Sequence, residues 1–170
     1  MSSWWGQEQL VVDHEQDGGE GVDEAVTRCR RALRDTPVAH PRRAPEAEAL
    51  GNALARRFHL GDNAADLNDA ITAYRDALKA PNADQGWDRT ACQVALADLV
   101  GRRYARTGRR ADLDEAIIRY RTAVRRTPRT RPARRTYLIR LAEALTVRGR
   151  LTGSTLDLAE AADATAEAAA

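Results

Sequence analysis

The chain has 170 residues and a formal net charge of +2, and 43% of its residues are hydrophobic but only 5% aromatic. The apolar residues are mostly Ala, Leu and Val without alternating β-branched runs, so we expect helices and enough chain for one domain or a short repeat array. No apolar stretch reaches the roughly 18 residues of a membrane span and the N-terminus lacks the pattern of a secretory signal, so we expect a cytoplasmic protein.

The N-terminal segment differs from the rest of the chain in charge and pattern. Residues 1–24 contain seven acidic residues and neither Lys nor Arg. Trp4 and Trp5 are costly to leave in water. Two alternatives stay open, which are a degenerate capping helix over the first repeat and an acidic tail with exposed tryptophans. We therefore separate residues 1–20 from a helical repeat domain over residues 21–170.

A block that begins at residues 22, 67, 113 and 156 recurs at spacings of 45, 46 and 43 residues. A period of this size indicates stacked helical repeats, each of which buries its apolar face only against its neighbours. The shared positions are Ala25, Cys29, Ala32 and Pro37; Ala70, Tyr74, Ala77 and Pro81; Ala116, Tyr120, Ala123 and Pro128; and, in a faded copy, Ala159 and Ala166. We expect these small and aromatic residues to form the packing stripe of one helix per repeat.

A second repeated element lies between these blocks. Its apolar residues are four apart on one helical face, as in Leu50, Leu54 and Phe58. Each repeat is therefore predicted to be an antiparallel pair, with a first helix A and a second helix B. The predicted helices span residues 22–35, 46–60, 66–80, 90–107, 112–127, 134–151 and 155–168.

Polar residues, glycines and prolines predict where these helices begin and end. The predicted N-terminal caps are Asp66 with Asp69, Asp112 with Glu115, and Thr155. Helix B is expected to end before each repeat proline, since proline cannot continue the backbone ladder. Gly61 and Gly108 are expected to provide the positive φ of the turn between helices A and B.

The steps from Ala116 to Tyr120, Ala123 and Pro128 resemble helix B of the tetratricopeptide repeat, and Leu50-Gly51-Asn52-Ala53 resembles the signature of its helix A. This unit is about a dozen residues longer than the usual 34. The phrasing from Arg106 to Ile117 is similar to long-period arrays of actinobacterial proteins, several of which sit beside CHAT or other effector domains. The resemblance implies an all-α, right-handed α-solenoid of antiparallel helix pairs.

The resemblance also implies a binding groove. In tetratricopeptide arrays, helix A lines the concave surface, and ligand contacts come from positions two and six residues after its signature Leu. These positions are Asn52, Arg56, Asp98, Arg102, Glu143 and Val147. The arginines suit a peptide carboxylate, whereas Asp98 and Glu143 favour a mixed-charge groove for a peptide or a helix. The alternative is that these residues only solvate the inner face.

Arginine is concentrated in one part of the chain. Residues 102–150 contain sixteen arginines against four acidic residues. A cluster between the second and third full repeats comprises Arg125, Arg126, Arg129, Arg131, Arg134 and Arg135. Three interpretations stay open: a solvated and partly ion-paired connection, a surface for an acidic partner such as the chain's own residues 8–24, and a nucleic-acid site. The missing aromatic residues and the interruptions at Pro128 and Pro132 disfavour nucleic acid.

The sequence contains no pattern typical of catalysis. None of its three histidines forms a pair with helical metal-ligand spacing, and no phosphate loop or nucleophile elbow occurs. Cys29 and Cys92 lie far apart and are expected to be buried thiols. We therefore expect no enzyme activity, no metal site and no cofactor.

These observations together predict a non-enzymatic scaffold or regulatory module that binds a protein or peptide partner. The first alternative is an Arg-rich nucleic-acid-binding module that uses residues 102–150. The second alternative is structural self-association through the Ala-rich helix at residues 155–170, which would give a homo-oligomer.

Overall fold

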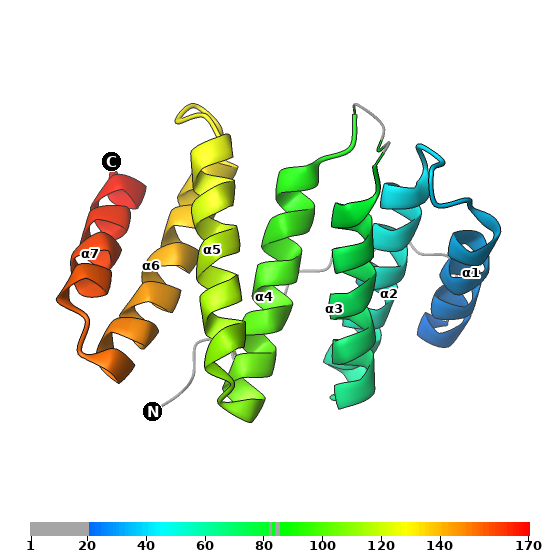
Figure 1. Cartoon of the computed structure of the whole chain (residues 1–170), viewed down its shortest axis with the longest axis horizontal. Helices are drawn as coiled ribbons and strands as arrows, with labels where there is room; N and C mark the ends of the chain where they lie inside the picture. The colour runs from blue at the N-terminus through cyan, green and yellow to red at the C-terminus, as the bar shows by residue number, and fades with distance from the viewer. Residues whose placement is uncertain (1–20, 82, 84–85) are drawn as a thin grey trace. The chain divides into compact units, whose positions relative to one another are not determined.

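A computed structural model describes residues 21–81, 83 and 86–170, and the described residues form helices joined by turns, without a strand (Figure 1). The predicted helical class is therefore confirmed, and every predicted helix lies within a few residues of an observed one. The helices are α1 (Val22–Asp35), α2 (Arg43–Gly61), α3 (Ala64–Lys79), α4 (Arg89–Thr107), α5 (Arg110–Arg126), α6 (Ala133–Thr152) and α7 (Thr155–Ala169). The predicted tail or capping helix at residues 1–20 lies outside the described residues.

The chain divides into two compact units, Met1–Cys92 and Gln93–Ala170, with the boundary inside α4. In the first unit, α2 packs against both α1 and α3. In the second unit, α6 packs against both α5 and α7. Each unit thus has an A-type helix, α2 or α6, between two B-type helices.

The repeated Ala and Tyr positions form the core of each unit. Ala70, Tyr74 and Ala77 are buried on α3, and Gly51 on α2 lies directly against the Tyr74 ring. A Cβ atom added at Gly51 would be 2.9 Å from two carbon atoms of that ring. Glycine is therefore required here by close approach of α2 to Tyr74, even though it lowers intrinsic helix stability.

The second unit repeats this packing, but the predicted register of its last copy is wrong. Ala116, Tyr120 and Ala123 are fully buried on α5. On α7, in contrast, the predicted Ala159 and Ala166 are exposed, whereas Ala161 and Ala164 are buried. The register shifts by two residues because Asp157, rather than a residue two positions earlier, occupies the place of Asp66 and Asp112, the third residue of its helix.

The predicted caps are also wrong by a few residues. Asn63 and Ser154 are the N-caps of α3 and α7, and their side chains accept hydrogen bonds from the backbone N–H groups of Ala65 (2.9 Å) and Asp157 (3.2 Å). Asp66 and Asp112 lie inside the first turn and are buried. Thr155 is the first residue of α7 and not its cap. The aspartates are therefore available for another role, which is described below.

The observed helix ends agree with the prediction at all three prolines and at one of the two glycines. Helices α1, α3 and α5 end before Pro37, Pro81 and Pro128, as predicted. Gly108 has a positive φ of 68°, as predicted, but the left-handed residue after α2 is Asp62, with φ 49°, and not Gly61. Helix α2 thus continues one residue further than the glycine alone suggests.

Candidate functional site

Three ion pairs with the same geometry recur along the chain, and we call them the repeat ion pairs. They are Arg57–Asp66, Arg103–Asp112 and Arg148–Asp157. In each, an arginine near the end of an A-type helix binds the aspartate nine residues later with both Nε and Nη2. The six N···O distances lie between 2.6 and 2.9 Å. Such bidentate pairs combine charge attraction with a defined orientation of the two side chains. Each pair therefore fixes the turn between an A-type and a B-type helix.

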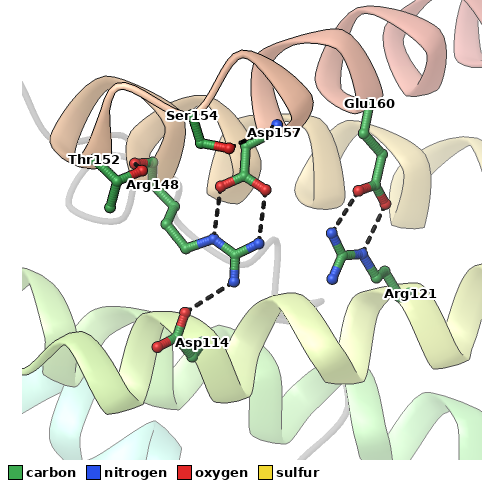
Figure 2. Close-up of polar contacts among 7 residues, drawn as sticks. All are labelled: Asp114, Arg121, Arg148, Thr152, Ser154, Asp157 and Glu160. Atoms are coloured by element: carbon green, nitrogen blue, oxygen red, sulfur yellow. Dashed lines mark hydrogen bonds and ion pairs between the residues drawn. The ribbon is translucent and has the colours of Figure 1, made fainter.

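Two of these arginines also bind a second carboxylate. The Nη1 group of Arg57 donates to Asp23 of α1, and that of Arg148 donates to Asp114 of α5, both at 2.9 Å. Figure 2 shows the Arg148 guanidinium between Asp157 of α7 and Asp114 of α5. Each of the two arginines therefore links three successive helices of its unit. The hydrogen bonds that they donate to these carboxylates raise the pKa of both arginines further above its ordinary value.

A further pair connects the two B-type helices of the second unit. Arg121 on α5 binds both carboxylate oxygens of Glu160 on α7 (Figure 2). The hydrogen bonds to Glu160 raise the pKa of Arg121. In the first unit, Arg30 on α1 binds Asp69 on α3 at 3.0 Å. Both pairs span 39 residues and belong to the packing of the repeats.

Another recurrent arginine satisfies the open end of the preceding helix. Arg43 donates to the carbonyl oxygens of Leu33 and Thr36, and Arg134 donates to those of Val124 and Thr127. Arg89 binds the carbonyl of Leu78 in the same way. The last carbonyls of a helix have no partner within the helix, so these guanidinium groups act as C-terminal caps. Arg134, one of the predicted cluster residues, thus has this intramolecular role and also binds Glu167 at 2.8 Å.

Two predicted groove residues, Asn52 and Arg56, lie in the first unit, and Asn52 also takes part in helix packing. Asn52 on α2 accepts a hydrogen bond of 2.5 Å from the hydroxyl of Tyr74 on α3. Asn52 is nevertheless exposed, and Arg56, one turn further along α2, is half-buried. The pair Asn52 and Arg56 therefore lies on one accessible stretch of α2, with the Asn52 carbonyl oriented by the buried Tyr74.

In the second unit the structure brings three predicted residues together around Tyr120. The Tyr120 hydroxyl donates to Asp98 of α4 at 2.5 Å, and Arg140 Nε of α6 is 3.9 Å from the same carboxylate oxygen. Arg102 of α4 and Glu143 of α6 are close enough to act electrostatically on the same groups. We call Asp98, Arg102, Tyr120, Arg140 and Glu143 the α4–α6 charge cluster. Its charged members are half-buried.

The electrostatics of this cluster differ from those of the repeat ion pairs. Burial lowers the pKa of Arg102, the nearby Asp98 opposes this effect, and Arg140 adds to it by repulsion. Burial and the Asp98 carboxylate together raise the pKa of Tyr120 well above its ordinary value of 10.0. Burial therefore lowers the pKa of Arg102, whereas hydrogen bonds to carboxylates raise that of Arg148.

Tyr120 and Arg140 were not predicted as members of this cluster. Tyr120 was assigned to packing, and Arg140 precedes the signature Leu141 from which groove positions were counted. The useful signal is a spacing, since each hydroxyl lies 22 residues after its acceptor, Asn52 or Asp98. Counting back 22 residues from a repeat tyrosine therefore identifies, from the sequence, the residue that accepts its hydroxyl hydrogen bond.

The predicted arginine cluster lies at the turn between α5 and α6. Arg125 makes a long hydrogen bond of 3.4 Å to Thr122, and Arg129 is 3.8 Å from Glu167. Arg126, Arg131 and Arg135 are exposed, and their side chains bind no hydrogen-bond or ion-pair partner among the described residues. The turn thus contains one half-buried structural arginine, Arg134, and an exposed cationic surface beside it.

The second unit also has a depression of about 500 Å³ along α5 that the sequence did not indicate. Ile118, which is 59% exposed, and Arg119 line it. The side-chain oxygen of Gln93, which also lines it, is buried without a hydrogen-bond partner. None of the charge-cluster residues lines this depression.

Within the described part of the chain, no group of His, Cys, Asp and Glu residues has the arrangement of a metal site. None of the described helices is both long and apolar enough to cross a membrane. Cys29 and Cys92 are buried free thiols, as predicted. Compared with known proteins, the chain matches no protein-family model and no curated protein sequence. Its relation to tetratricopeptide repeats therefore stays a prediction from the residues themselves.

Proposed function

We propose that this chain is a non-enzymatic protein-binding module, built as a right-handed α-solenoid of tetratricopeptide type, that binds a peptide or a partner helix. The observation that carries the proposal is the α4–α6 charge cluster. Asp98, Arg102 and Glu143 are expected in the groove from their positions after the signature Leu. They lie close together around Tyr120, whose hydroxyl donates to Asp98. Charged side chains that only solvate the inner face are expected to be exposed, because burial removes part of their hydration.

The cluster favours a ligand with charges of both signs. Arg102 and Arg140 suit a carboxylate through charge-assisted hydrogen bonds, and Asp98 and Glu143 suit an amine or an N–H group. The repeat ion pairs do not offer such sites, because their arginines already bind carboxylates at 2.6–2.9 Å. Partner binding is thus expected on the cluster and on Asn52 with Arg56, rather than at the turns that the repeat ion pairs hold.

The same proposal places the protein in the cytoplasm as a scaffold or regulatory subunit. Two buried free cysteines are typical of a reducing compartment. The similarity of Arg106–Ile117 to arrays beside effector domains supports a regulatory role.

Affinity capture from the source cell tests this function. The full chain and an Arg56→Glu/Arg102→Glu variant would serve as baits, with Arg110→Glu/Arg150→Glu as the matched control. Arg110 and Arg150 are exposed, so the control makes the same charge change away from the cluster. Proteins retained by the wild type and the control but lost from the first variant support the proposal. Equal capture by all three baits, with unchanged circular dichroism, would show that the cluster does not bind the partner.

A further inference from the structure

The turn between α5 and α6 carries more arginine than its structural role requires. The three A-type helices α2, α4 and α6 each place one arginine, Arg43, Arg89 or Arg134, on the carbonyls of the preceding helix. The last turns of α1, α3 and α5 each contain a basic residue as well, Arg34, Lys79 and Arg125 among them. A cation there interacts favourably with the helix dipole. Both features therefore recur at the α1–α2, α3–α4 and α5–α6 turns, and folding explains them.

The remaining arginines of the turn have no counterpart in the other repeats. Asp35 and Ala80 occupy the place of Arg126, and Ala44 and Thr90 occupy that of Arg135. The corresponding connection at residues 80–88 contains no arginine at all. The surplus residues, which we call the turn arginines, are Arg126, Arg129, Arg131 and Arg135.

The turn arginines are exposed and incompletely neutralised. The Arg129 side chain is 85% exposed, and its contact with Glu167 is 3.8 Å, whereas Glu167 binds Arg134 at 2.8 Å. Arg126, Arg131 and Arg135 have no ion-pair partner among the described residues. The four turn arginines lie within ten residues of one turn, and like charges repel each other. A bound multivalent anion would reduce this repulsion.

We propose that the turn arginines form a docking surface for an acidic segment of a separate protein, independently of the α4–α6 charge cluster. Guanidinium groups recognise carboxylates with two parallel hydrogen bonds. This chain itself uses that geometry in its repeat ion pairs. An Asp/Glu-rich segment is complementary in charge and could bind several turn arginines at once.

A nucleic acid fits the same surface less well. Residues 125–136 contain no aromatic side chain on which a base could stack. Pro128 and Pro132 flank the turn and prevent it from extending α6 into a helix that could enter a groove. Only phosphate contacts would remain, and these give binding without sequence preference.

Fluorescence anisotropy with the full chain tests the proposal. The probes are a labelled peptide of alternating Glu and Gly, its Gln counterpart, and a single-stranded oligonucleotide of the same charge. The test variant is Arg126→Glu/Arg131→Glu/Arg135→Glu, and the control is Arg109→Glu/Arg110→Glu/Arg150→Glu, which changes three other exposed arginines equally. We expect the Glu peptide to bind, the test variant to lose at least about tenfold in affinity (about 1.4 kcal/mol), and the control to lose much less. An Arg→Lys triple variant should bind more weakly than the wild type, because lysine lacks the two-pronged geometry.

Several results would overturn the proposal. Equal losses in the test and control variants would show nonspecific attraction, and tighter binding of the oligonucleotide than of the Glu peptide would identify a nucleic-acid surface. A full-length variant in which Glu8, Asp13, Glu15, Asp17 and Glu20 become Gln or Asn should keep the wild-type affinity. A clear increase would instead assign the surface to the chain's own acidic segment.

Discussion

Arg148 and Asp157 face each other across the turn between α6 and α7, with Arg148 Nε 2.8 Å from Asp157 Oδ2 and Arg148 Nη2 2.7 Å from Asp157 Oδ1. The third nitrogen of Arg148 reaches Asp114 on α5. One side chain therefore fixes a turn and joins three helices. The same relation occurs in the first unit at Arg57, which makes it part of how the repeat is built rather than a local feature of one turn.

Replacing Arg148 by Met should destabilise the second unit because it leaves the nearly buried Asp157 carboxylate without its cation. We expect a loss of about 2–3 kcal/mol, less than the roughly 3–5 kcal/mol for a fully buried pair, because the Arg148 side chain is 24% exposed. Urea unfolding measures the change. The matched control is Arg31→Met, whose pair with Asp35 is 3.8 Å long and 79% exposed on the arginine side, and which should cost less than about 0.5 kcal/mol. Similar losses in both variants would contradict this role.

The stability contributed by Asp157 should depend on pH in the acid range. Hydrogen bonds from Arg148 hold the pKa of Asp157 below its ordinary value of 3.8. Since the folded pKa is the lower one, the contribution is complete above the unfolded pKa, near about pH 4, and is lost as pH falls through the folded pKa. The difference in unfolding free energy between wild type and Asp157→Asn should thus be constant above about pH 5 and shrink below pH 4. A difference that stays unchanged down to pH 2 would show that the carboxylate charge is not involved.

The hydroxyl groups of the two repeat tyrosines, Tyr74 and Tyr120, should contribute differently to the free energy of unfolding. Tyr120 donates to the carboxylate of Asp98, whereas Tyr74 donates to the amide of Asn52, each at 2.5 Å. Hydrogen bonds to charged groups contribute about 1.5–3 kcal/mol against about 0.5–1.5 kcal/mol for neutral ones. Tyr120→Phe should therefore lower the unfolding free energy more than Tyr74→Phe, as measured by chemical denaturation. The reverse order would mean that the hydrogen bond to the Asp98 carboxylate contributes less than the one to the Asn52 amide.

Gly51 should not tolerate even a methyl group. Its Cβ would be 2.9 Å from the Tyr74 ring, which is 2% exposed and is fixed at its hydroxyl by Asn52. Overpacking should cost Gly51→Ala about 1–3 kcal/mol, despite the roughly 1 kcal/mol by which alanine favours a helix. Gly61→Ala, at the last residue of the same helix, is the control, since no atom lies within 4 Å of the Cβ that it would add and its φ is not positive. Thermal unfolding should show a lower midpoint for the first variant and a nearly unchanged one for the second.

The register of α7 can be tested with two alanines two residues apart. Ala161 is 4% exposed, whereas Ala159 is exposed. Ala161→Leu should destabilise the second unit by about 1–3 kcal/mol through overpacking, and Ala159→Leu should change it by less than about 0.5 kcal/mol. Urea unfolding of both variants gives the answer. A larger loss of unfolding free energy in Ala159→Leu would support the register that the sequence repeat predicts.

The sequence alone determined the helical class and most helix bounds. Proline stops, Ala-rich packing stripes and the 45-residue period depend on local geometry, which each stretch of chain carries within itself. Ala116 and Tyr120 were therefore assigned to the core correctly, and α1 was predicted at its observed bounds, Val22–Asp35. For the site, position counting selected Asp98, Arg102 and Glu143, which the structure brings together.

Only the tertiary structure decided which charges are structural and which remain available. From the sequence, a carboxylate at the start of a helix is interpreted as its N-cap. Asp66 and Asp112 instead bind the arginines nine residues earlier, because the turn between the two helices brings these residues together. The same contact sets the register of α7 at Asp157, against the sequence pattern. Ion pairs of this kind depend on distances between helices, which no local pattern encodes. Arg134 and Arg126, close neighbours in the sequence, thus have different roles, one as a half-buried cap and the other as an exposed cation.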